Sequence, residues 1–158
     1  MSTLRQSVSN RLILISQSLV VDTAVAYSAG DALAAKIELQ NAAEAGRGGG
    51  VISALSVGDL AKQGADIDFL FFDDALTSVP VANAAFDLAD ADAAKFIGMA
   101  QLTIDSLLVD NAVGFIQPAS PIPFVAVATS LWMVAVCRGT PTYATAADVT
   151  VRVVIERG

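Results

Sequence analysis

Residues 131–158, LWMVAVCRGTPTYATAADVTVRVVIERG, hold the clearest pattern in the chain. The apolar run LWMVAVC predicts a buried strand, and turn-forming residues such as Gly139 and Pro141 follow it. In the final stretch apolar and polar side chains alternate: Val149, Val151, Val153 and Ile155 with Thr150, Arg152 and Glu156. A period of two is typical of a strand with one face in water, so the stretch predicts an antiparallel pair of strands.

Short strands separated by turns are expected along the rest of the chain as well. The expected strands are Arg11–Asp22 (one bulged strand or two short ones), Leu33–Gln40, Val51–Val57, Ile67–Phe72, Phe96–Ile104, Leu107–Val109, Ala112–Ile116 and Phe124–Ala128. Ile67–Phe72 is apolar on both faces apart from Asp68, which favours a central position or one face at an interface. The fold class predicted is all-β: an antiparallel β-sandwich, jelly-roll-like, with one short helix.

The helix is expected around residues 90–95, within FDLADADAAKFIG. Asp90 or Asp92 is expected to cap it, and Lys95 lies nearer its carboxyl end, as the helix dipole prefers. A chain of 158 residues fits one domain with a substantial core. We expect residues 11–158 to form that domain and residues 1–10, which are polar and unpatterned, to form an N-terminal arm.

The composition is apolar for a globular protein. Hydrophobic residues make up 54% of the chain and charged residues 16%, against a typical value of about 25%. So few charges indicate that part of the surface is covered by other chains, and contacts between identical subunits are the simplest cover. A membrane-spanning helix is not expected, because Pro118, Pro121 and Pro123 interrupt the longest uncharged segment and leave it too short to cross.

The net charge of −7 is spread unevenly. Residues 1–58 contain four basic and four acidic side chains, residues 59–110 two and ten, and residues 111–158 three and two, giving 0, −8 and +1. A surface that binds nucleic acid needs clustered Lys and Arg, which this sequence does not supply. Direct binding to nucleic acid is therefore not expected.

The sequence offers little for catalysis. It has no histidine and one cysteine, Cys137. Because Cys137 lies in an apolar run, we expect it to be a small buried side chain. The acidic residues of the middle third are the one group that suggests chemistry. Asp87, Asp90 and Asp92 are the candidate ligands of a calcium or magnesium ion, although DLADAD lacks the glycine and distal glutamate of an EF-hand loop. We expect no catalytic residues and no cofactor.

Two features bear on an alternative role in binding glycans or a receptor. Tyr27, Trp132 and Tyr143 are aromatic side chains that stack on sugars in other proteins, but core packing is the simpler role for them here. The loops at Gly46–Gly50 and Gln117–Pro123 are the other candidates. The string GRGGG lacks the spacing of a phosphate-binding loop and predicts a flexible hairpin loop.

Four strings together resemble small structural proteins of tailed bacteriophages, over about Asp22 to Glu156. They are YSAGDAL at residues 27–33, FLFFDDALT at 69–77, FDLADADAAKFIG at 86–98 and LWMVAVCRGTPTYATAADVTVRVVIE at 131–156. The resemblance implies a virion protein of the capsid decoration or cement kind, which is a β-sandwich often presented as a trimer on the outside of the shell. The first twenty residues fall outside the shared pattern.

The function implied is non-enzymatic attachment to the capsid surface, with the major capsid protein and further copies of the chain, as a homotrimer, as partners. Such a protein is made in the host cytoplasm and ends on the virion. The arm offers Leu4, Arg5 and Val8 as candidate capsid-binding residues. A glycan- or receptor-binding module is the alternative, and a metal-dependent hydrolase built on the aspartates is the more remote one.

Overall fold

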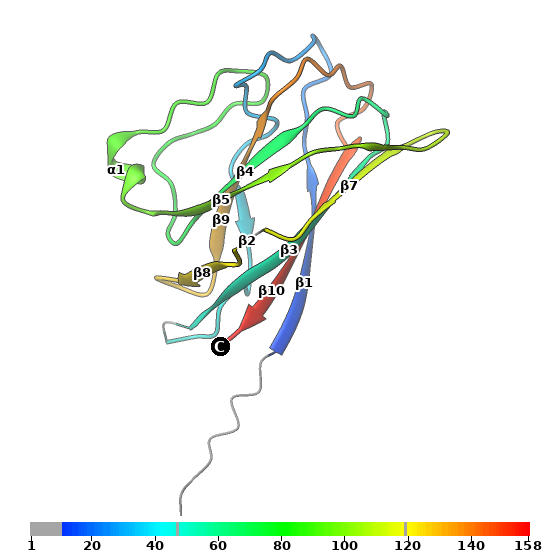
Figure 1. Cartoon of the computed structure of the whole chain (residues 1–158). Helices are drawn as coiled ribbons and strands as arrows, with labels where there is room; N and C mark the ends of the chain where they lie inside the picture. The colour runs from blue at the N-terminus through cyan, green and yellow to red at the C-terminus, as the bar shows by residue number, and fades with distance from the viewer. Residues whose placement is uncertain (1–10, 47, 119) are drawn as a thin grey trace, which may run out of the picture.

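The fold is that of a computed structural model, which describes residues 11–46, 48–118 and 120–158. It is an all-β sandwich of two antiparallel sheets with one short helix, which confirms the predicted fold class (Figure 1). The elements are β1 (Arg11–Leu19), β2 (Ile37–Leu39), β3 (Gly49–Asp59), β4 (Ile67–Phe72), α1 (Asp90–Ala93), β5 (Phe96–Leu102), β6 (Ser106–Leu107), β7 (Ala112–Ile116), β8 (Ile122–Val125), β9 (Leu131–Cys137) and β10 (Val149–Arg157).

The larger sheet has six strands in the order β1-β10-β3-β7-β6, and β8 also pairs with β3. The long strand β3 bonds β10 along one edge and shares its other edge between two partners. Residues 55–59 of β3 face β7, and residues 49–52 face β8. Pro123 is tolerated in β8 because that strand lies at the edge of the sheet.

The smaller sheet has four strands in the order β2-β9-β4-β5. Its central strand β4 is the aromatic segment Ile67–Phe72, so the predicted central position is confirmed. Phe69 and Phe71 are fully buried between the two sheets, together with alternate residues of β9 and β10. The period of two in these strands therefore produces the core between the sheets.

The strands β9 and β10 differ from the prediction in their pairing. The strand β9 has the predicted bounds and β10 begins at the predicted Val149, but they do not pair with each other. Instead, β9 lies between β2 and β4, and β10 lies between β1 and β3 in the other sheet. The intervening residues 138–148 carry the chain from one sheet to the other. The alternation of side chains reports which face of a strand is buried, and it contains no information on the neighbouring strand.

Four local predictions need correction. Residues 11–19 form one strand with no register shift against β10, and β2 covers only three residues of the expected Leu33–Gln40. In the string GRGGG, Gly49 and Gly50 belong to β3 instead of a loop. The cap of α1 is Ala89, with no side-chain hydrogen bond to the helix, because the carboxylate of Asp92 binds Thr77 and Ser78.

Candidate binding surface

The outer face of the six-stranded sheet carries rows of side chains that the strand register sets side by side. Leu14 of β1 lies opposite Val154 of β10, which lies opposite Ala54 of β3. The next row toward the start of β1 contains Leu12, Glu156, Val51 and Pro123. Leu12 and Leu14 are 65% and 59% exposed, so apolar side chains of β1 lie open to solvent.

Two further rows cross the same face at the other end of the sheet. One runs Ser16, Arg152, Ser56, Phe115, and the next runs Ser18, Thr150, Gly58, Val113. Phe115 is 63% exposed. Since facing residues of neighbouring strands share a face, these side chains form one surface of apolar groups, hydroxyls and a guanidinium.

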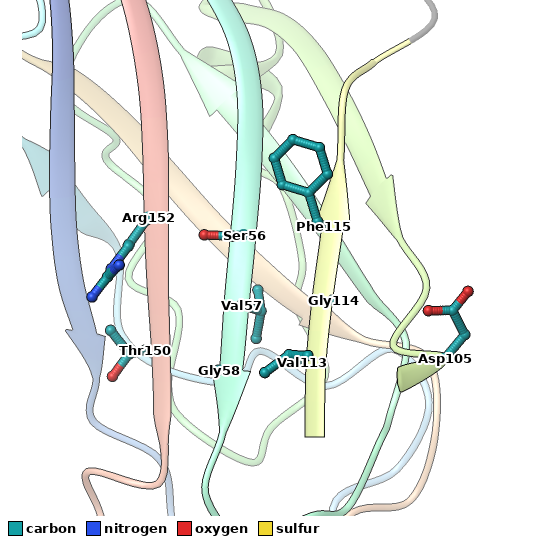
Figure 2. A pocket seen from close by; sticks show the side chains of 9 residues that line it. All are labelled: Ser56, Val57, Gly58, Asp105, Val113, Gly114, Phe115, Thr150 and Arg152. Carbon is teal, nitrogen blue, oxygen red and sulfur yellow. The ribbon is translucent and has the colours of Figure 1, made fainter. Parts of the chain in front are cut away.

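A groove of about 540 Å³ lies on this face between β10 and β7. Figure 2 shows Arg152 and Thr150 on the β10 side, Val113 and Phe115 on the β7 side, and Ser56 and Gly58 between them; Val57, Asp105 and Gly114 complete the lining. The groove exists because β3 presents only small residues here. A Cβ at Gly58 would meet no atom within 4 Å, so the space above this residue is open.

The outer face of the four-stranded sheet is different, because the chain covers it. Residues 73–95, which connect β4 to β5 and include α1, lay Leu76, Phe86 and Leu88 against Phe72 and Val134 of the sheet. Leu70, Trp132 and Val136 pack at the border of this second apolar cluster. The segment therefore covers part of the outer face of the four-stranded sheet, where Met99 of β5 remains 44% exposed, whereas Leu12, Leu14 and Phe115 are exposed on the six-stranded sheet.

The candidate metal ligands occupy the same covering segment. Asp87 and Asp90 are exposed, whereas Asp92 is fully buried. Asp92 accepts hydrogen bonds from the backbone and hydroxyl groups of Thr77 and Ser78 at 2.6–3.0 Å, and it forms an ion pair with Lys95 at 2.9 Å. Across residues 11–46, 48–118 and 120–158, no group of three or more Asp, Glu, His or Cys is placed to hold a metal ion.

The hydrogen bonds also determine the electrostatics of Asp92. Burial raises the pKa of this carboxyl group, but the donors of Ser78, Thr77 and Lys95 outweigh burial and hold the pKa well below its usual range. The carboxylate is thus ionised at any ordinary pH. Its contacts fasten α1 to the loop at residues 77–78, which is a structural use of the charge.

The remaining candidate residues divide between the core and undescribed parts of the chain. Tyr27 and Tyr143 are buried and pack edge to face at 5.7 Å, which confirms core packing for both. Cys137 is buried, and burial raises the pKa of its thiol, which disfavours the nucleophilic thiolate. The candidate capsid-binding residues Leu4, Arg5 and Val8 lie outside the described residues.

The structure brings together the two glycine- and proline-rich segments that the sequence offered as binding loops. Gly49 and Gly50 pair with Val125 and Phe124, so the end of one segment lies beside the strand that follows the other. The groove was not predicted. Phe115, Ser56 and Thr150 are 35 or more residues apart in sequence, and only the strand order makes them neighbours.

Comparison with known proteins adds no relative. The sequence matches no family model, and a search of curated proteins finds no significant match. In the described part of the chain, none of the helical structure is long and apolar enough to cross a membrane.

Proposed function

We propose that the chain is a non-enzymatic decoration protein that binds the outside of a bacteriophage capsid shell and stabilises it through protein contacts. The observation that carries the proposal is the outer face of the six-stranded sheet, where the apolar side chains of Leu12, Leu14 and Phe115 are exposed. Large exposed apolar patches on soluble proteins mark interaction sites. The major capsid protein is the proposed partner, and the virion surface is the proposed location.

The energetics of such a surface suit attachment to a repeating shell. Each 1,000 Å² of apolar area removed from water contributes on the order of 25 kcal/mol of gross transfer free energy, before the costs of association. A lattice offers many equivalent sites, so a complex of several copies binds more tightly than one copy does. Self-association, as a homotrimer, is part of the proposal.

Co-sedimentation with shells tests the proposal. Purified shells from a phage that encodes this chain, stripped of it, are mixed with the wild-type protein and with the double variant Leu14→Thr/Phe115→Thr. We expect the wild type to sediment with the shells and the variant to lose at least tenfold in affinity, because two exposed apolar side chains leave the contact.

A control variant separates a specific surface from general stickiness. Val79→Thr/Val81→Thr removes two side chains that are just as exposed but lie on residues 73–95. This control should bind shells as the wild type does. A wild-type protein that stays in the supernatant, or a Leu14→Thr/Phe115→Thr variant that binds unchanged, would refute the proposed attachment.

A glycan- or receptor-binding role is the second candidate, and the groove is the observation that favours it. Phe115 of β7, Ser56 of β3 and Thr150 of β10 line it, and the guanidinium of Arg152 extends from β10 toward β1 (Figure 2). A flat apolar ring beside hydrogen-bonding groups is an arrangement that suits a sugar. Screening the purified protein on a glycan array tests this role, and a Phe115→Ala variant should lose any signal found.

A further inference from the structure

The guanidinium of Arg152 forms no ion pair within the part of the chain that the structure describes. The side chain is exposed, and the acid of its own strand, Glu156, is four residues along β10 and therefore about 13 Å away. Arg138, by contrast, donates to both carboxylate oxygens of Asp68, at 3.1 and 2.8 Å. The fork of donors on Arg152 is thus available to an anion from outside the chain, and a carboxylate matches the geometry of such a fork.

Hydroxyl groups surround this guanidinium on the sheet. Ser16 of β1 and Ser56 of β3 lie directly opposite Arg152. Ser18 and Thr150 face each other in the next row. Among residues 11–46, 48–118 and 120–158, none of these four hydroxyls forms a hydrogen bond with another protein group. A hydroxyl both donates and accepts hydrogen bonds, as the hydroxyls of a saccharide do, so the two kinds of group suit each other.

Gly58 leaves the floor of the groove open beside these hydroxyls. It pairs with Thr150 of β10 on one side and with Val113 of β7 on the other, and neither ladder shifts register at this residue. Glycine inside a strand often marks a bulge or a place where a ligand approaches the backbone closely. Because the ladders are regular at Gly58 and a Cβ there would meet no atom within 4 Å, the glycine fits the approach of a ligand.

The groove has a charged end and an aromatic end. Arg152, Ser56 and Phe115 lie in one row across β10, β3 and β7, so two strand spacings, about 10 Å, separate the first from the last. The guanidinium extends toward β1, which lengthens this span (Figure 2). A single pyranose ring is too short to contact both ends. Asp105 lines the groove beyond β7, so the negative group of a ligand belongs at the Arg152 end.

We propose that the groove binds an oligosaccharide of two or more rings that carries a carboxylate. Arg152 binds the carboxylate beside the hydroxyls of β1 and β10, and the sugar rings lie over Gly58 toward Phe115. The inference rests on the glycan-binding role, which is the second candidate function, and names the class of glycan.

A glycan array probed with the full chain tests the proposal. The array carries neutral, sulfated and carboxylated oligosaccharides of increasing length, the last as galacturonate, glucuronate and sialic acid chains and as their methyl esters. We expect signal on carboxylated chains of two or more rings, and at least tenfold less on the methyl esters, which keep the rings and lose the charge.

Three variants locate the contact. Arg152→Gln should bind the carboxylated chains at least tenfold more weakly, and Gly58→Val should lose binding because its side chain fills the groove. Arg11→Gln is the matched control: it removes the same charge from another exposed arginine, five residues from Ser16 in β1, and should bind as the wild type does. Circular dichroism and Tm should stay those of the wild type for both arginine variants, since both side chains are exposed.

Several results would overturn the inference and leave glycan binding in place. They are signal confined to neutral saccharides, equal signal on acids and methyl esters, stronger signal on sulfated than on carboxylated chains, and an Arg152→Gln variant that binds as the wild type does. Equal losses in Arg152→Gln and Arg11→Gln would also overturn it, because they would indicate attraction by overall charge. An array with no signal for the wild-type protein would exclude the inference and the glycan-binding role together.

Discussion

The buried carboxylate of Asp92 links two parts of the segment 73–95, which covers the smaller sheet. Its hydrogen bonds to Thr77 and Ser78 and its ion pair with Lys95 depend on the negative charge. We therefore expect Asp92→Asn to lower the Tm by several degrees at neutral pH, because an amide leaves some of these donors unpaired. Asp90→Asn, at an exposed neighbour in the same helix, should change the Tm little.

The effect of Asp92 should depend on pH in a defined direction. Its pKa is lower in the folded state than the value of about 3.9 in an unfolded chain. The stabilisation is therefore complete above about pH 4 and decreases as the pH falls below that value. The Tm difference between wild type and Asp92→Asn should shrink in acid, and thermal melts across that range measure it. A difference that stays constant would mean that the charge is not the stabilising feature.

Among the strands, β3 depends on a glycine where three strands meet. A Cβ on Gly50 would lie 2.5 Å from the backbone oxygen of Glu156 in β10 and 2.9 Å from the ring of Phe124 in β8. Because backbone cannot move aside easily, we expect Gly50→Ala to destabilise the fold by about 1–3 kcal/mol. Gly58→Ala, in the same strand with open space above it, is the matched control and should stay within about 0.5 kcal/mol of the wild type. Denaturant unfolding of both variants measures the difference.

Strand identity was predictable from the sequence, and strand pairing was not. A strand buried on both faces is an apolar run in the sequence, and a strand buried on one face alternates between apolar and polar residues. These patterns predicted β4 at Ile67–Phe72, β9 at Leu131–Cys137 and β10 from Val149 onward. The same alternation placed β9 and β10 in one hairpin, which is wrong. The partner of a strand depends on long-range packing, and a turn-rich connection of 11 residues, 138–148, is long enough to change sheets.

At the scale of the molecule, the candidate surface follows from the strand order. The exposed face could not be predicted from the sequence, because Leu14, Val154 and Phe115 come to share one face only through the strand order, in which β10 and β3 lie between β1 and β7. From its apolar, weakly charged composition we predict that other copies of the chain cover part of the surface, and this stays a prediction. Within the chain itself, the segment 73–95 covers part of the outer face of the smaller sheet.

The exposed face and the net charge together predict how the protein behaves in mild acid. At neutral pH the charge of −7 opposes further association of the protein, and this repulsion vanishes near the isoelectric point of about 4.3. The carboxyl groups of Asp22, Asp92 and Asp148 have lowered pKa values, so these groups remain ionised as the surface neutralises. We expect light scattering to rise as the pH approaches this point while the circular dichroism spectrum stays that of the folded protein.

The variant Leu14→Thr/Phe115→Thr should scatter less at the same pH, because the apolar area that drives association is smaller. Equal scattering by both proteins would show that association under these conditions does not use this face.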